Sequence, residues 1–219
     1  MKQLVKRLVL PHGRQFRRLR GGIARGMLME IDLAHQSQRY FGFDERELLA
    51  TLRKLIQSTK SQIDIGANDG YYTMAFLRSK AERVIACEPG PVMEQLIANA
   101  KANGYEPGKR FITERRLVGL SEGGVSITEL VEGLPGPVLL KVDIDGGEFE
   151  LLQSAATCES LNDLRWLIET HSPELETQCV AWLQSHGYRT RIIYNARWRV
   201  LLPELRPIPH NRWLIAEPV

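Results

Sequence analysis

The feature that most constrains the fold of this chain is the regular alternation of short apolar runs with helical patterns from residue 62 onward. The runs RVIAC and VLLKV, at 83–87 and 138–142, have the length of buried strands, and helical patterns lie between most of the successive runs. Strands joined in this way run parallel and need helices on both faces of their sheet. The sequence therefore predicts an α/β fold with a doubly wound, mostly parallel, Rossmann-like sheet of about seven strands.

The pattern gives approximate bounds for each element. We expect strands at 62–65, 83–87, 110–120, 138–142, 165–169, 188–194 and 211–217, with a small extra strand near 125–127, and helices at 71–79, 91–103, 148–156 and 173–186. Upstream, an alternating pattern at 27–33 predicts a strand, and Asp44 followed by Glu47 predicts a capping box that begins a helix. We divide the chain into a basic amino-terminal extension with short strands, 1–43, and the main α/β domain, 44–219.

Charge is distributed unevenly along the 219 residues. The net charge is +3, but residues 1–29 carry eight Lys and Arg and no acid, so the rest of the chain, with 21 basic and 26 acidic residues, carries −5. A uniformly basic nucleic-acid-binding domain is therefore not indicated. The leader, 2–25, has three interpretations: a solvated arm, a contact with an anionic membrane surface, or a contact with an anionic acceptor such as RNA or a phosphorylated glycan. Its apolar residues Leu4, Val5, Leu8 and Val9 recur at helical spacing until Pro11.

Other sequence features bear on the compartment. No apolar run approaches the roughly 18–20 residues that a membrane span needs. The three cysteines, Cys87, Cys158 and Cys179, are far apart and lack zinc-site spacing, which is typical of reduced cytosolic thiols. We expect a cytoplasmic protein, with the leader as its one candidate for membrane contact.

The segment from Asp64 to Thr73 (DIGANDGYYT) is the sharpest chemical signal, because it falls where the first predicted strand of the sheet turns into a helix. Gly66 allows a tight turn and close approach of a ligand to the backbone. A dinucleotide-binding turn would have a second glycine two residues later, where Asn68 stands here. A ligand with an amino-acid carboxylate and a nucleoside, such as S-adenosylmethionine, therefore fits better than one with a diphosphate. The alternatives are a plain strand-to-helix turn and an NAD-type nucleotide-binding oxidoreductase.

Glu88 ends the second strand of the sheet, in Cys87-Glu88-Pro89, where a carboxylate can accept hydrogen bonds from ribose hydroxyls. With these features, the chain from about residue 22 to 218 resembles the FkbM-type family of S-adenosylmethionine-dependent, class I methyltransferases. The resemblance extends through segments listed here in chain order: DIGANDGYYT (64–73), Glu88-Pro89 with Leu96, Asn99, Asn103 and Gly104, Leu120-Ser121-Glu122 with Gly124, KVDIDGGE (141–148) with Leu152, Glu169-Thr170-His171 and the closing 211–218. The chain departs from the family at Asp145, where Glu is usual, and at Gln153-Ser154, where a basic residue and Gly are common.

The resemblance implies a set of cofactor-binding residues. Asp64, Gly66, Ala67, Asn68, Gly70, Tyr71 and Thr73 would line the methionine part of S-adenosylmethionine, Glu88 with Pro89 would hold the ribose, Leu120 and Ser121 would approach the adenine, and Asp143 would lie under the methyl group. It also implies that the enzyme methylates a hydroxyl of a sugar, a glycolipid or a secondary metabolite, so the partner is a small-molecule or glycan acceptor. A catalytically silent module with this fold is the remaining alternative.

Transfer to a hydroxyl needs a group that takes the proton, within hydrogen-bond reach of the acceptor. The candidates are Asp143, Glu148 and His171, with Glu169 as a neighbour, and His171 is the most base-like because its ordinary pKa is near neutral. Glu148 has the alternative role of a helix cap, and His171 that of a polar loop residue. A metal held by Asp143, Asp145, Glu169 and His171 is a further alternative, but we predict no metal.

Overall fold

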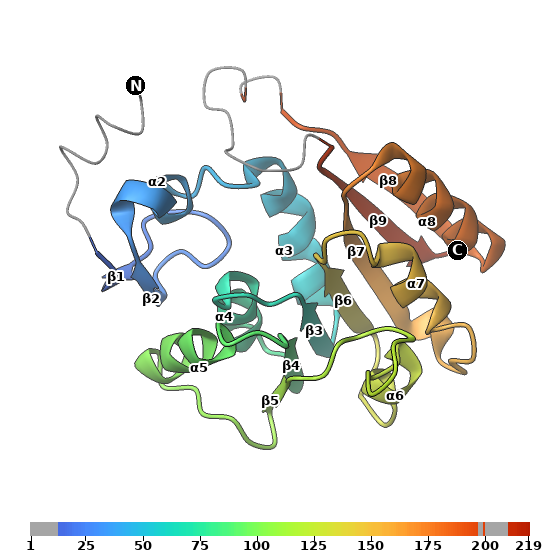
Figure 1. The fold of residues 1–219 in the computed structure, drawn as a ribbon, viewed down its shortest axis with the longest axis horizontal. Helices are drawn as coiled ribbons and strands as arrows, with labels where there is room; N and C mark the ends of the chain where they lie inside the picture. The colour runs from blue at the N-terminus through green and yellow to red at the C-terminus, as the bar shows by residue number, and fades with distance from the viewer. Residues whose placement is uncertain (1–12, 197–198, 200–209) are drawn as a thin grey trace.

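A computed structural model describes residues 13–196, 199 and 210–219. The helical spacing expected at residues 4–9 therefore lies outside the described residues. A large sheet occupies the centre, and a two-stranded sheet lies to one side of it (Figure 1). The large sheet contains seven strands: β3 (Ser61–Ile65), β4 (Arg83–Cys87), β5 (Phe111–Glu114), β6 (Val138–Val142), β7 (Leu164–Thr170), β8 (Tyr188–Ile193) and β9 (Arg212–Pro218). The small sheet contains β1 (Gln15–Arg18) and β2 (Leu28–Ile31).

The strand order in the large sheet is β5-β4-β3-β6-β7-β9-β8. The first five strands in this order are parallel, and β9 runs antiparallel between β7 and β8. The predicted doubly wound, mostly parallel sheet is thus confirmed. The order reverses between β3 and β6, and Ile65 of β3 pairs with both Cys87 of β4 and Val142 of β6. The carboxyl ends of three adjacent strands are therefore level at the switch point, where doubly wound sheets bind ligands.

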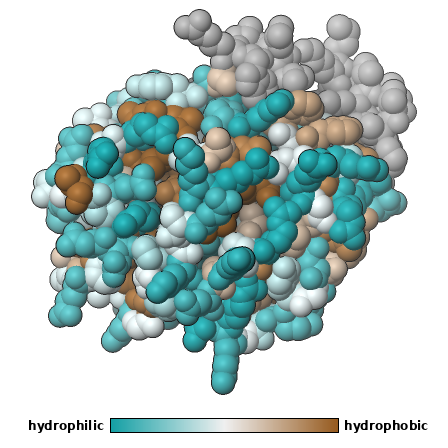
Figure 2. Space-filling model, turned by 180° about the vertical axis from the view of Figure 1, so that it is seen from behind, coloured by the Kyte–Doolittle hydropathy of each residue, from teal (hydrophilic) through white to brown (hydrophobic). Residues whose placement is uncertain are grey.

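Helices cover both faces of the sheet. One apolar cluster joins the sheet to α3 (Leu49–Ser58), α4 (Tyr71–Arg78) and α5 (Met93–Ala102), and a second joins it to α6 (Ile127–Val131), α7 (Glu148–Gln153) and α8 (Pro173–Ser185). The local sequence explains where α8 begins, because the Ser172 side chain accepts from the Leu175 N–H and Pro173 takes a position that needs no amide donor. No helix in the described ranges has both the length and the apolar character needed to cross a bilayer. Figure 2 shows one face, largely hydrophilic, with separate apolar patches.

The described part of the amino-terminal extension shares a core with α3, α4 and α5. Met29 and Ile31 of β2 are fully buried in that cluster. The side chain of Asn103 accepts from the Leu28 N–H and donates to the Leu28 carbonyl, and Asn99 accepts from the Glu30 N–H. These contacts attach β2 to α5, and they give a structural role to Asn99 and Asn103, two residues of the pattern shared with the FkbM-type family.

Some predicted elements are wrong. Asp44 does not cap a helix: a short 3-10 turn, η1 (Arg46–Leu48), precedes α3, and Glu45 before it has a positive φ of 48°. The expected strand near 125–127 is only a single bridge between Val118 and Val125, and α6 follows because the Ser126 side chain caps it. A helix that was not predicted, α2 (Leu33–Phe41), follows β2 and is capped by Asp32.

Candidate active site

The turn after β3 is built on a close backbone approach. Gly66 has a φ of +70°, and a Cβ at this position would lie 1.9 Å from the carbonyl oxygen of Asp143. The Asp143 N–H in turn donates to the Ile65 carbonyl at 3.1 Å. Only glycine fits here, because a side chain would push the first turn away from the end of β6. The turn and Asp143 are thereby held side by side at the switch point.

Hydrogen bonds inside the protein occupy every backbone N–H of this turn. Gly66 and Ala67 donate to the Cys87 carbonyl, each at 3.0 Å, and Gly70 donates to the Ala67 carbonyl. The Asp69 N–H is taken by the side chain of Asn68, which has a φ of 49°. The Asn68 N–H donates to the Glu88 carboxylate at 3.0 Å. The turn therefore offers no amide cradle for a diphosphate, and free N–H groups begin only in the first turn of α4.

Glu88 lies at the end of β4 with a carboxylate fixed by two backbone donors. One oxygen accepts from Asn68 at 3.0 Å and the other from the N–H of Gly90 at 2.7 Å. A carboxylate oxygen can accept more than one hydrogen bond, so each retains capacity for a ligand hydroxyl. That Glu88 holds a ribose stays a prediction.

A cavity of about 310 Å³, which we call the cavity beside Glu88, lies at the carboxyl ends of β3 and β4. Cys87 and Pro89, the chain neighbours of Glu88, line it, whereas Glu88 itself is not among its lining residues. Its volume is at the lower end of the range for small-molecule sites. Its walls come from the ends of the strands and the loops after β5 and β6, and the lining residues are Ile65, Gly66, Cys87, Pro89, Arg116, Leu117, Val118, Ser121, Ile144, Asp145, Gly147 and Glu150. Of the two predicted adenine contacts, Ser121 lines the cavity, whereas Leu120 is 58% exposed beside it. The sequence did not single out Leu117, a 57% exposed apolar residue on the same loop.

Asp64 does not face the cavity. It is completely buried, and its carboxylate accepts from the Thr73 hydroxyl at 2.6 Å and pairs with the Lys141 ammonium at 3.1 Å. Lys141, also buried, donates to the Gly66 carbonyl at 3.2 Å and lies 3.4 Å from Asp143. Burial opposes the charged ammonium, but Asp64 and Asp143 outweigh it and raise the pKa of Lys141. Lys141 therefore links the first turn to Asp143, a role that the sequence reading missed.

The first turn is also connected to α2. The Arg39 guanidinium contacts both carboxylate oxygens of Asp69, at 3.0 and 2.9 Å, and Gln36 donates to the same carboxylate. The Arg39 guanidinium also lies 5.2 Å from the centre of the Tyr71 ring. The predicted methionine-binding residue Tyr71 is thus packed beneath the amino-terminal extension.

Predicted catalytic residues meet at the carboxyl ends of β6 and β7. His171 Nδ1 lies 2.5 Å from the Glu148 carboxylate, and its Nε2 lies 3.8 Å from Asp143 and 3.5 Å from Asp145. Glu148 is fully buried, although it is the first residue of α7, and Asp145 is exposed and borders the cavity. Nδ1 is within hydrogen-bond distance of the Glu148 carboxylate and carries a hydrogen, whereas Nε2 faces Asp143 and Asp145 at longer distances, and Asp145 borders the cavity. Burial opposes protonation of His171, but the hydrogen bond with Glu148 and the nearby carboxylates outweigh it and raise its pKa.

Asp143, Glu169 and His171 place one potential metal-ligand atom each within 4.8 Å of one another. Oxygen and imidazole ligands at this spacing could hold a divalent ion. The Nδ1 hydrogen bond to Glu148 serves equally well for an imidazole that acts as a base. That no metal binds here stays a prediction.

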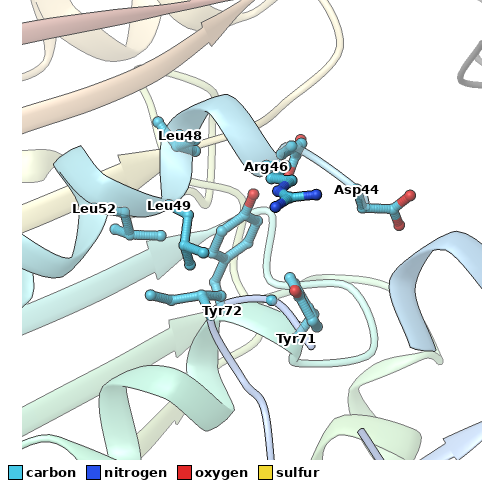
Figure 3. A pocket seen from close by; sticks show the side chains of 10 residues that line it. Asp44, Arg46, Leu48, Leu49, Leu52, Tyr71 and Tyr72 are labelled. Atoms are coloured by element: carbon cyan, nitrogen blue, oxygen red, sulfur yellow. The ribbon is translucent and has the colours of Figure 1, made fainter. Parts of the chain in front are cut away.

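A second hollow lies near the start of α4, lined by Tyr71 and Tyr72 from below and by the segment around Arg46 and Leu48 from above (Figure 3). Its volume of about 10 Å³ is close to the minimum for one water molecule. The Tyr72 hydroxyl is buried and has no hydrogen-bond partner among the described residues. The hollow is too small for a cofactor, so the cavity beside Glu88 is the candidate ligand site.

Several solved methyltransferase structures share this fold. The chain is similar to the FkbM methyltransferase of Methylobacillus flagellatus (TM-score 0.57, 17% identity, covering 73% of this chain and 44% of that one). It is also similar to an S-adenosylmethionine-dependent O-methyltransferase of Thermotoga maritima (TM-score 0.52, 12% identity, 80% and 65%). A third similar structure is TrmK of M. capricolum with S-adenosylhomocysteine (TM-score 0.51, 18% identity, 79% and 67%).

The chain thus has the Rossmann-like fold of class I methyltransferases, with a small antiparallel strand pair at its amino-terminal side. It spans less than half of the Methylobacillus protein. No protein-family model matches the chain, and no curated protein matches it.

Proposed function

We propose that this protein is an S-adenosylmethionine-dependent methyltransferase. The observation that carries the proposal is the cavity beside Glu88, whose walls come from the carboxyl ends of β3 and β4 and the loops after β5 and β6. The fold, shared with several methyltransferases, supports it. The turn argues against an NAD-type oxidoreductase. Every N–H from Gly66 to Gly70 is already hydrogen-bonded within the protein, so a diphosphate would find no donors in this turn.

The residues present fit this cofactor. Glu88 has an oriented carboxylate for the ribose, and Gly66 lets the first turn lie against the Asp143 carbonyl after β6, where a side chain cannot fit. The proposed contacts are Gly66, Ala67, Asn68, Gly70 and Tyr71 for the methionine part, Glu88 and Pro89 for the ribose, Leu120 and Ser121 for the adenine, and Asp143 for the region of the methyl group. Thr73, completely buried like Asp64, takes part through its hydrogen bond to that carboxylate. Asp64 contributes by holding Thr73 and Lys141 rather than by contact. When bound, S-adenosylmethionine supplies an electrophilic methyl group with a positive charge.

The side chains around His171 suit a cationic donor and a hydroxyl acceptor. Asp143, Asp145 and Glu148 lie within 4 Å of the imidazole, and their negative charge favours a sulfonium nearby. His171 Nε2 can take the proton of an acceptor hydroxyl, and Glu148 holds the ring in the tautomer that this requires. We infer that the acceptor is a hydroxyl of a sugar, glycolipid or secondary metabolite, as the resemblance to the FkbM-type family implies.

A ligand-dependent unfolding experiment tests the proposal. S-adenosylhomocysteine at about 100 times its dissociation constant should stabilise the protein by about 2.7 kcal/mol, which corresponds to a rise in Tm of about 5–10 °C for a chain of this size. NAD at the same concentration should leave Tm unchanged. A shift with NAD and none with S-adenosylhomocysteine would contradict the proposal and favour the oxidoreductase.

A further inference from the structure

Five arginines lie within one short segment of the amino-terminal extension: Arg14, Arg17, Arg18, Arg20 and Arg25. Within the described residues, no carboxylate forms an ion pair with any of them. The side chains of Arg14, Arg17, Arg18 and Arg20 donate to neutral groups, such as the Gly26 carbonyl and the Tyr40 hydroxyl. By contrast, Arg39, Arg116 and Arg212 in the rest of the protein each contact a carboxylate. The segment therefore presents positive charge that the fold does not neutralise.

Two exposed aromatic rings accompany these arginines. Met29 and Ile31 of β2 point into the core, so the opposite face of the hairpin carries Phe16 and Arg18 of β1. Glu30 and Leu28 of β2 are their cross-strand partners, and among the described residues Glu30 is the one acid on this face. Phe16 is 50% exposed. Phe41, 53% exposed, stacks edge-on against Tyr40, whose hydroxyl accepts from Arg20. We name the set Arg14, Phe16, Arg18, Arg20, Arg25 and Phe41 the basic-aromatic patch.

The patch has the chemistry of a site for phosphate groups next to an apolar phase. A guanidinium binds phosphate through two parallel hydrogen bonds, and an exposed phenyl ring gains from burial in a lipid interface. The sequence that leads into the patch, 1–12, adds three basic residues, no acid and the aliphatic residues Met1, Leu4, Val5, Leu8, Val9 and Leu10. Aliphatic side chains gain free energy at a bilayer interface, whereas single-stranded nucleic acids are bound by aromatic stacking and charge.

We infer that the basic-aromatic patch binds an anionic phospholipid surface. This surface is separate from the cavity beside Glu88, so the inference does not depend on methyl transfer. The patch is nevertheless connected to the candidate active site, because α2, which ends at Phe41, also carries Arg39 on Asp69 of the first turn.

Vesicle co-sedimentation of the full chain tests this inference, with phosphatidylcholine vesicles that contain or lack 30% phosphatidylglycerol. Each arginine near an anionic surface contributes about fivefold to binding, so the triple variant Arg14→Gln, Arg18→Gln, Arg20→Gln should bind anionic vesicles about 100-fold more weakly. A matched control, Arg53→Gln, Lys54→Gln, Arg189→Gln, removes the same charge from exposed positions on α3 and β8. It should bind like the wild type, and an unchanged Tm in both variants shows that they are folded. Phe16→Ser should weaken the part of the binding that survives high salt.

Three results would overturn the inference. One is equal binding of the wild type to neutral and anionic vesicles. Another is an equal loss in the patch variant and the control, which would mean that net charge alone is responsible. The third is patch-dependent binding of a mixed-sequence single-stranded RNA with no binding to vesicles, which would identify a nucleic acid as the partner.

Discussion

His171 illustrates how single side chains define the chemistry of the candidate site. It lies on the loop after β7, and Glu148, 23 residues earlier at the start of α7, contacts its Nδ1 at 2.5 Å. A buried carboxylate opposite Nδ1 keeps a hydrogen on that nitrogen, and Nε2 faces the carboxylates of Asp143 and Asp145. The alternative role of Glu148 as a simple helix cap is less consistent with this geometry, since its side chain is not the hydrogen-bond cap of α7.

The raised pKa of His171 gives the first prediction at this scale. Glu148→Gln should lower the pKa of His171. Burial lowers this pKa and the nearby carboxylates raise it, and the variant removes the carboxylate that forms the hydrogen bond. Since the folded pKa lies above the ordinary value near 6.5, the pair stabilises the fold fully below about pH 6.5 and loses this contribution as the pH rises through the folded pKa.

NMR titration of the histidine ring signals measures this directly, with His171→Gln to assign the resonance and Glu150→Gln as a control on the exposed side of α7. The ¹⁵N shifts report the tautomer in the same experiment. An unchanged pKa and tautomer in Glu148→Gln would remove Glu148 as the positioning residue.

At the scale of elements, the pair of β3 and β6 is held by more than its backbone ladder. Lys141 of β6 contacts Asp64 of β3, the Gly66 carbonyl after β3 and Asp143 after β6. Lys141→Met should destabilise the protein by about 3–5 kcal/mol, because it leaves Asp64 buried and unpaired. The double variant Asp64→Asn, Lys141→Met should recover much of this loss, since the buried charge is removed with its partner.

Urea unfolding of the two variants measures the loss and the recovery. Lys101→Met serves as the control, because its ion pair with Glu106 is exposed and should contribute less than about 1 kcal/mol. If Lys141→Met unfolds at the same urea concentration as the wild type, the pair does not hold the two strands together.

The same elements show what sequence can predict. The bounds of β4 and β6 agree with the prediction because both strands are almost wholly buried, so their apolar runs are continuous. By contrast, α2 has few apolar residues and forms because Asp32 caps it and Arg39 binds Asp69, a contact 30 residues away in the sequence. The role of Lys141 could not be predicted for the same reason, because it depends on a contact that is distant in the sequence. Lys141 pairs with Asp64, which belongs to another strand.

At the scale of the whole molecule, residues 1–29 carry a charge of +8 and the rest of the chain carries −5. Where the structure describes them, these opposite charges lie on different elements. The acids of the candidate site, Asp143, Asp145 and Glu148, surround His171 at the carboxyl edge of the large sheet. The five arginines without an ion pair among the described residues lie just before β1, on β1 and in the loop between β1 and β2. The described part of the extension nevertheless shares a core with the main domain, so both surfaces belong to one packed body.

The central claim is that the cavity beside Glu88 binds S-adenosylmethionine, and isothermal titration calorimetry with S-adenosylhomocysteine tests it most directly. The wild type should bind one equivalent. Glu88→Ala should bind about 10–100-fold more weakly, because a charged acceptor of ribose hydrogen bonds is lost. Glu82→Ala, which removes an exposed carboxylate near the other end of β4, should bind like the wild type. Binding that is absent in the wild type, or equal in Glu88→Ala, would contradict the account.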